Sequence, residues 1–134
     1  MKQIKQMGCL FFILITLIAC SDKSDDTEKN KDIAVAQIVQ QYYADIATGR
    51  LESAKQMISQ ENAQAEEMET YMLRIINNEM KKRGGYESID IASIKYTNEN
   101  EANVEAFINM KTDIKSENIM LIKEHEQWKI KPHP

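Results

Sequence analysis

Few side chains in this 134-residue chain could carry acid–base chemistry. There are only two histidines, His125 and His133, and they lie near the C-terminus, in an expected turn and in the tail. Glu105 and Asn109 flank Phe107 on one face of an expected strand, where a buried carboxylate with a raised pKa would suit an isomerase or a hydratase. The other face of that strand is wholly apolar, so we expect Glu105 to face solvent.

Sequence motifs for other chemistries are absent. The chain contains no HExxH zinc motif, no glycine-rich phosphate loop and no nucleophile elbow. We therefore predict no catalytic residue, no metal site and no cofactor, and we keep an isomerase-like or hydratase-like enzyme as the alternative.

Cys20 lies in a context that indicates a covalent lipid anchor. Residues 1–7 are basic, and residues 10–18 form an apolar run about half as long as the ~20 residues that a transmembrane helix needs. The run leads into Leu-Ile-Ala-Cys at 17–20, which resembles the bacterial lipobox. This resemblance implies that residues 1–19 are a signal peptide and that acyl chains on Cys20 hold the mature protein in the membrane. An uncleaved signal anchor, with Cys20 as an ordinary thiol, is the alternative.

Removal of the signal peptide would leave an acidic chain with no free thiol. Loss of Lys2 and Lys5 reduces 17 basic residues to 15 against 21 acidic residues, a net charge of −6. Such a chain is a poor partner for nucleic acid, which requires a basic surface. With Cys9 removed and Cys20 lipidated, no disulfide can form, so the core alone must stabilise the domain.

Residues 21–31 carry only polar and charged side chains, which indicates a disordered tether between Cys20 and a domain over residues 32–134. Ser21 stands where many Gram-negative lipoproteins that are retained in the inner membrane have aspartate. By this resemblance we expect an outer-membrane location, on the periplasmic side or, given the acidic cluster that follows, on the cell surface.

A helical period predicts three helices at the start of the domain, over approximately residues 32–48, 51–58 and 63–82. The first has an apolar stripe that should face the core, formed by Val35, Ile38, Val39, Tyr42 and Ile46. The third has a corresponding stripe formed by Ala65, Met68, Met72, Ile75, Ile76 and Met80.

The apolar period then changes to two, which predicts four strands. They cover residues 86–97, 101–110, 118–123 and 127–131, with turns at 98–100 and 124–126 and a loop at 111–115. A slip in the alternation at Ala92-Ser93 predicts a β-bulge. The order of elements predicts an α+β fold, in which three N-terminal helices pack on one face of a curved four-stranded antiparallel sheet.

Three stretches carry a family resemblance. They are the aromatic helix and following Gly-polar-Ala pattern of residues 41–54, the Gly84-Gly85 pair, and Ile-Lys-Glu-His-Glu-Gln-Trp-Lys-Ile at 122–130. Together they resemble small bacterial lipoproteins of the cystatin-like, nuclear-transport-factor-2-like superfamily, whose domain has been called lumazine-binding-like. The resemblance covers roughly residues 35–131 and implies a curved sheet around a long helix, with a conical cavity at the open end. His125-Glu126 replace the usual Asp-Gly, which leaves the turn type open.

Two groups of apolar residues are candidate binding surfaces. One could line a pocket for a small apolar ligand, or simply fill the core: Tyr42, Tyr43, Met68, Met72, Ile76 and Trp128. The other should lie on the back of the sheet and could bind an envelope protein or a second copy of the chain: Phe107, Met120 and Ile122. The sequence therefore favours a membrane-anchored, non-catalytic binding domain, with a purely structural protein-interaction module as a further alternative.

Overall fold

The computed structural model describes residues 23–61 and 65–132, and side chains from residue 26 onward. The predicted signal peptide, the lipidation of Cys20 and His133 lie outside the described residues. The chain divides between Lys31 and Asp32 into two units. The domain described below is the unit that begins at Asp32.

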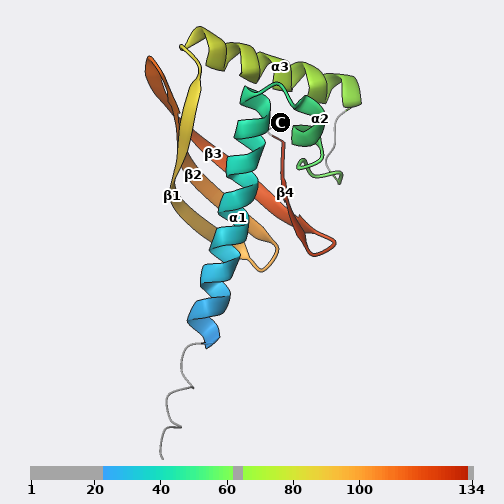
Figure 1. The fold of residues 1–134 in the computed structure, drawn as a ribbon. Helices are drawn as coiled ribbons and strands as arrows, with labels where there is room; N and C mark the ends of the chain where they lie inside the picture. Colours follow the sequence, from blue (N-terminus) through green and yellow to red (C-terminus); the bar gives the residue numbers. More distant parts are fainter. Residues whose placement is uncertain (1–22, 62–64, 133–134) are drawn as a thin grey trace, which may run out of the picture. The chain divides into compact units, whose positions relative to one another are not determined.

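Three helices precede four strands in the chain (Figure 1). The helices are α1 (Lys23–Ala47), α2 (Leu51–Lys55) and α3 (Glu66–Lys82). The strands β1 (Tyr86–Asn98), β2 (Glu101–Met110), β3 (Asp113–Glu124) and β4 (Gln127–Ile130) form one antiparallel sheet in the order β1-β2-β3-β4. Within the domain, α1 crosses one face of the sheet and α3 lies at one end of it (Figure 1). The predicted α+β fold with a four-stranded antiparallel sheet is confirmed.

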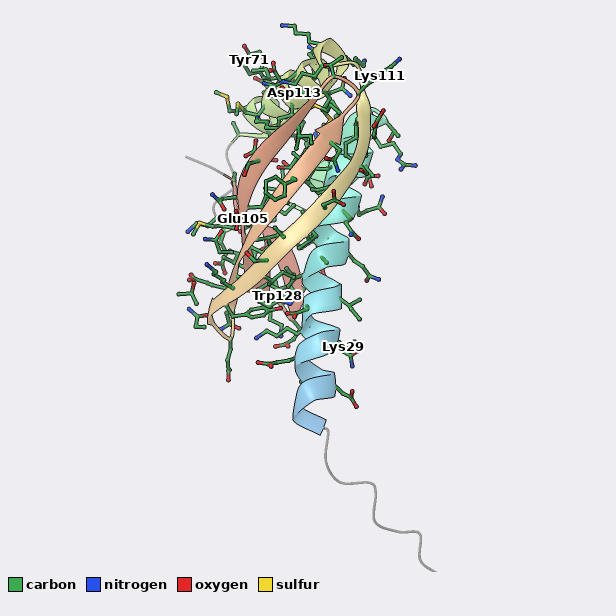
Figure 2. All side chains as sticks on the ribbon, turned by 90° about the vertical axis from the view of Figure 1, so that its left-hand side faces the viewer. Lys29, Tyr71, Glu105, Lys111, Asp113 and Trp128 are labelled. Atoms are coloured by element: carbon green, nitrogen blue, oxygen red, sulfur yellow. The ribbon has the colours of Figure 1, made fainter. Side chains whose placement is uncertain are left out.

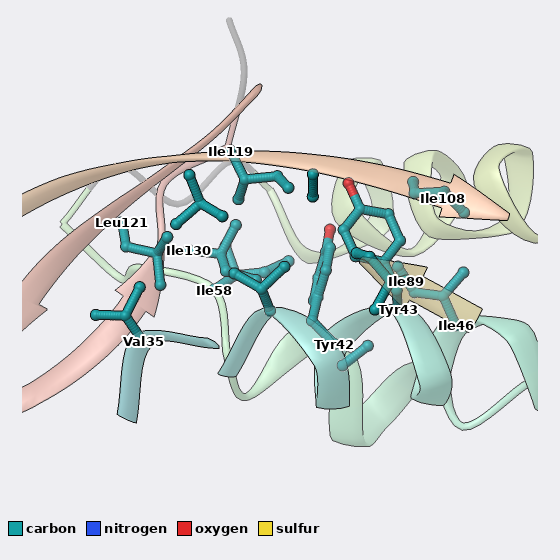
Figure 3. Packing of buried hydrophobic residues seen from close by; sticks show 14 of the residues in the cluster. Val35, Tyr42, Tyr43, Ile46, Ile58, Ile89, Ile108, Ile119, Leu121 and Ile130 are labelled. Carbon is teal, nitrogen blue, oxygen red and sulfur yellow. The ribbon is translucent and has the colours of Figure 1, made fainter. Parts of the chain in front are cut away.

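The stripe predicted for the first helix faces the core. Four of its residues are buried in the core cluster: Val35, Val39, Tyr42 and Ile46 (Figure 3). The predicted start near Asp32 was wrong, because α1 begins at Lys23 and so includes most of the stretch predicted to be a disordered tether. The side chains of residues 26–30 are exposed, so burial does not explain this extension. Lysine and glutamate favour helix, and lengthening an existing helix avoids the cost of nucleation.

Helix α3 is rotated relative to the prediction. Its buried residues are Glu69, Leu73, Asn77 and Met80. Three residues of the stripe that was predicted to face inward are instead exposed: Met68 (48%), Met72 (45%) and Ile75 (43%). Asn77 helps to fix this rotation, because its side-chain amide donates a hydrogen bond of 2.6 Å to the carbonyl oxygen of Ile46 in α1. Glu69, about two turns earlier on the same face, is thereby turned toward the domain interior.

A buried carboxylate holds the turn between α1 and α2. Asp45 is 1% exposed. Its carboxylate accepts hydrogen bonds from three side chains: Gln41 Nε2 at 2.8 Å, Arg50 Nε at 3.1 Å and Ser53 Oγ at 2.7 Å. Burial acts to raise the pKa of Asp45, but these hydrogen bonds and the charge of Arg50 outweigh it, so the pKa is lowered. Asp45 therefore stays ionised and anchors α2 to the end of α1.

The sheet agrees with its predicted alternation in β2 and differs in β3. The apolar face of β2 is buried as predicted: Ala102, Val104, Ala106, Ile108 and Met110. The bulge predicted at Ala92-Ser93 is confirmed by a shift in register between Ile91 and Ser93. The predicted loop at 111–115 was largely wrong, because β3 begins at Asp113. Its first residues pair with the last residues of β2, and such pairing is not visible in the period of β3 itself.

The β3–β4 hairpin closes through two residues of positive φ. His125 (φ 49°) and Glu126 (φ 66°) lie between the paired residues Glu124 and Gln127. This geometry is that of a type I′ turn, which matches the twist of the flanking strands. The hairpin forms even though neither turn residue is the asparagine or glycine that usually accepts positive φ.

The chain after α2 runs beside β4 instead of continuing as helix. Ile58 forms a parallel bridge with Ile130, and the backbone N–H of Ser59 donates to the carbonyl oxygen of Ile130 at 2.7 Å. The predicted helix over 51–58 was therefore too long at its end. Glu124 fastens this segment, because its carboxylate accepts hydrogen bonds from the hydroxyl of Ser59 and from the next two backbone N–H groups.

Candidate functional site

A cavity of about 310 Å³ lies between the helices and the sheet. Its apolar walls come from α3, from the segment after α2 and from β3 and β4: Ile58, Met72, Leu73, Ile76, Ile119 and Ile130. A second cavity of about 220 Å³ shares Tyr43, Ile76 and Glu117 with the first. The two cavities are therefore neighbours that meet at these three side chains.

Two consecutive tyrosines of α1 form the floor of the larger cavity. The rings of Tyr42 and Tyr43 pack edge to face, with centroids 5.2 Å apart and an interplanar angle of 84°. Both side chains are buried, and their hydroxyl groups point from α1 toward the strands (Figure 3). The tyrosines therefore place two hydroxyl groups beside the apolar walls of the cavity.

Two carboxylates also line the larger cavity. Glu69 of α3 is 9% exposed, and its Oε1 atom is buried with no hydrogen-bond partner. Glu117 of β3 pairs with Ala106, a residue of the buried face of β2, so it lies on the inner side of the sheet. Its carboxylate is 2.7 Å from the ammonium group of Lys115. Neither carboxylate was predicted, because the expected third strand began after Glu117 and the expected α3 face excluded Glu69.

The buried environment raises the pKa of both tyrosine hydroxyl groups. Burial raises the pKa of Tyr42 to about 12, and the carboxylates of Glu69 and Glu117 add to the effect. Burial also raises the pKa of Tyr43, with further contributions from Tyr42 and Glu117. Both phenols therefore stay protonated at neutral pH, where they can donate and accept hydrogen bonds but do not act as phenolates.

The structure brings together four of the six predicted pocket residues. Tyr42, Tyr43, Met72 and Ile76 line the larger cavity, whereas Met68 and Trp128 do not. Met68 lies on the exposed side of α3. Trp128 is buried and packs against Tyr96, with ring centroids 6.1 Å apart. It lies toward the opposite end of the sheet from Tyr71 of α3 (Figure 2). The predicted lining is thus corrected at these two positions.

The predicted partner face on the back of the sheet is not continuous. Phe107 is 38% exposed and Met120 is 43% exposed, but Ile122 is buried, which corrects the prediction for that residue. Met120 pairs with Asn103, which lies four residues from Phe107 along β2. At about 3.3 Å per residue, this separates the two exposed side chains by roughly 13 Å. They do not form one apolar patch by themselves.

The candidate acid of the enzyme hypothesis faces away from the cavity. Glu105 is exposed, accepts a hydrogen bond of 3.4 Å from the hydroxyl of Ser93 and lies on the outer face of β2 (Figure 2). Asn109 bonds to Asp90 at 2.7 Å on that same face. The hypothesis that Glu105 is a cavity acid was therefore wrong, and the expectation that it faces solvent is confirmed.

Within residues 23–61 and 65–132, no group of three or more His, Cys, Asp or Glu side chains is arranged to hold a metal ion. No helix in that part of the chain is long and apolar enough to cross a membrane.

Comparison with known proteins identifies the fold. No protein-family model and no curated protein sequence matches the chain. The solved structure of a Campylobacter jejuni protein, provisionally described as an NTF2-like transpeptidase, is similar with a TM-score of 0.58 and 19% sequence identity. The similarity covers 73% of this chain and 97% of that protein. It confirms the expected nuclear-transport-factor-2-like (NTF2-like) fold, and at this identity it shows the fold alone.

Proposed function

We propose that this NTF2-like domain is a non-catalytic binding domain, anchored in the bacterial envelope by lipid on Cys20, and that the cavity beside Tyr42 and Tyr43 holds a small, largely apolar ligand. The observation that carries the proposal is the cavity itself. Its volume of about 310 Å³ falls at the lower end of the range for ligand pockets.

The composition of the walls supports a ligand site. Small-molecule pockets are mostly apolar and contain a few polar groups that orient the ligand. Here, aliphatic side chains of α3 and the strands supply the apolar surface, while two tyrosines, two carboxylates and Lys131 supply the polar groups. Met72 is 45% exposed and lines the cavity. This flexible side chain could adapt to a ligand at the entrance.

The anchor rests on the sequence. The Leu-Ile-Ala-Cys motif at 17–20 supports lipidation of Cys20, and Ser21 after the cysteine supports an outer-membrane location. Two or more acyl chains would hold the protein stably at the membrane. The domain would then present its cavity on the periplasmic side or at the cell surface.

Native mass spectrometry of the mature protein, purified from its own host, tests ligand binding. We expect an extra mass that remains under native conditions and is lost on denaturation. Ile76→Trp should reduce the fraction of protein with bound ligand, because Ile76 lines the cavity and the indole ring would fill part of it. Tyr71→Trp, at a 60% exposed position on α3, is the matched control and should retain the ligand. Equal occupancy in both variants would argue against the cavity as the binding site.

An exposed apolar face on α3 favours a protein partner as a second candidate. Its residues follow the i, i+3, i+4, i+7 spacing of one helix face: Met68, Tyr71, Met72 and Ile75. Helix faces of this kind are common protein-binding surfaces, and aromatic and methionine side chains are enriched in them. Crosslinking from position 71 in the native envelope would identify such a partner. Absence of any crosslink would leave the ligand as the better proposal.

A further inference from the structure

The carboxylate of Glu69 is an exception among the buried charged groups of the domain. Asp45 receives three side-chain hydrogen bonds, and Glu124 receives one from Ser59 and two from backbone N–H groups. The ammonium group of Lys55 lies 2.8 Å from Glu52 and also donates to Thr70. By contrast, Oε1 of Glu69 is buried and has no partner.

An unpaired buried carboxylate oxygen is costly, so its position requires an explanation. Leaving a buried acceptor without a hydrogen-bond donor destabilises the folded protein, and more so where the acceptor is charged. The orientation of α3 is a second unexpected feature, because it turns the charged Glu69 inward while the apolar Met68 and Met72 remain exposed. Departures of this kind from sequence-level preference concentrate at functional sites. Oε1 itself is buried, but Glu69 lines the cavity, so a small rotation of its carboxylate toward this space would let a bound ligand supply the missing donor.

The charges around the cavity indicate which kind of donor fits. Glu69 and Glu117 contribute two carboxylates, and Lys131 contributes the cationic side chain among the lining residues. Lys115 lies on the wall of the neighbouring cavity and pairs with Glu117. The hydroxyl groups of Tyr42 and Tyr43 add neutral donors and acceptors. The group that still lacks a hydrogen-bond partner is an acceptor, Oε1 of Glu69. A protonated amine would supply the donor.

We propose that the ligand of this cavity is a small apolar molecule with a primary ammonium group, which donates a hydrogen bond to the buried Oε1 of Glu69 while its apolar body lies against Met72, Leu73 and Ile76. The inference rests on the proposed ligand-binding function and specifies the chemistry of the ligand. A charge-assisted hydrogen bond is stronger than a neutral one and would offset the burial of the carboxylate. A neutral hydroxyl group would donate a weaker hydrogen bond, and a ligand with no donor would leave Glu69 unpaired.

Three probes with the same chain and different head groups test the inference: octylammonium, 1-octanol and octanoate. The protein would be the mature chain, residues 20–134, with Cys20→Ser so that no lipid or detergent competes for the cavity. Isothermal titration calorimetry at pH 7 would measure each affinity. We expect octylammonium to bind at least tenfold more tightly than 1-octanol, and octanoate to bind most weakly.

Two variants test whether the preference for octylammonium over 1-octanol depends on the side chain of Glu69. Glu69→Gln keeps the shape but removes the charge, so it should abolish the advantage of octylammonium over 1-octanol. Glu67→Gln removes an exposed carboxylate from the same turn of α3 and should retain the advantage. Circular dichroism would verify that each variant folds. If Glu69→Gln does not fold, Glu69→Asp draws the charge back by one methylene group and should also reduce the preference.

The other possible outcomes separate the inference about the ammonium group from the proposed ligand-binding function. Equal binding of octylammonium and 1-octanol would overturn the inference while leaving the ligand-binding function intact. Preference for octanoate would overturn it in favour of an anion site at Lys131. Failure of all three probes to bind would count against the proposed ligand-binding function itself. Loss of the octylammonium preference in both Glu variants would show that overall charge, and not Glu69, is responsible.

Discussion

Replacing Glu69 by methionine should stabilise the domain when no ligand is present. The substitution removes the buried oxygen that has no hydrogen-bond partner and introduces an apolar side chain of similar length into an apolar wall. Removal of the unsatisfied acceptor should contribute about 1–3 kcal/mol of stability. Glutamate and methionine have similar helix propensities, so the helix itself should change little.

One effect opposes the stabilisation that Glu69→Met should give. Glu69 is among the acidic residues near the N-terminus of α3, where a negative charge stabilises the helix dipole by about 0.3–1 kcal/mol. Glu67→Met loses a similar interaction at an exposed position, so it is the matched control. The difference between the two variants therefore isolates the effect of burial. We expect Glu69→Met to be more stable than Glu67→Met by about 1–2 kcal/mol.

Thermal unfolding followed by circular dichroism would measure this difference. For a domain of this size, about 1 kcal/mol corresponds to roughly 4–8 °C in Tm. The proteins should be refolded from denaturant first, because a copurified ligand would stabilise the wild type and mask the effect. If Glu69→Met unfolds at a lower temperature than Glu67→Met, the carboxylate is stabilised by the protein itself, and the reasoning about an unmet hydrogen bond is refuted.

Three further predictions concern the fold and the anchor. Asp45→Asn should cost about 1–3 kcal/mol in urea unfolding. Because the folded pKa of Asp45 is lowered from 3.8, its stabilising effect is present above pH 3.8 and is lost as the pH falls through the folded pKa. The wild type should therefore lose its advantage over Asp45→Asn progressively as the pH falls below 3.8, and an advantage that did not shrink with falling pH would contradict this. Gly84→Ala should destabilise the domain by at least about 1 kcal/mol more than Gly49→Ala. Both glycines have positive φ, but only at Gly84 would an added Cβ meet a neighbour, the Cβ of Lys111 at 2.8 Å. Equal melting temperatures of the two variants would disprove this steric argument. Cys20→Ala should release the protein from the membrane fraction or stall its processing, whereas a correctly cut form that stays in the membrane would overturn the lipobox interpretation.

The fold was predictable where one strand or helix carries its own pattern. The alternation of β2 and the slip at Ala92-Ser93 are local features, and both were interpreted correctly. The start of β3 was missed because it depends on pairing with the end of β2. The start of α1 was missed because helix propagation through exposed residues leaves no apolar period to detect.

The site was predictable only in part, and the reason lies in α3. Tyr42 and Tyr43 were found because aromatic residues beside a strong apolar stripe are conspicuous. Glu69 was missed because the apolar period of α3 favours the face with Met68 and Met72, whereas tertiary contacts such as the bond from Asn77 to α1 set the actual rotation. No pattern in one helix reveals a hydrogen bond to another helix. A polar residue turned inward by such a bond is therefore invisible in the sequence.

The most direct test of ligand binding beside Glu69 is a crystal structure of the protein purified from its own host without a refolding step. We expect a non-protein molecule in the cavity between α1, α3 and the sheet, with a nitrogen atom within about 2.7–3.2 Å of Oε1 of Glu69. A cavity closed by protein side chains, or a Glu69 carboxylate paired with a group of the protein, would contradict it.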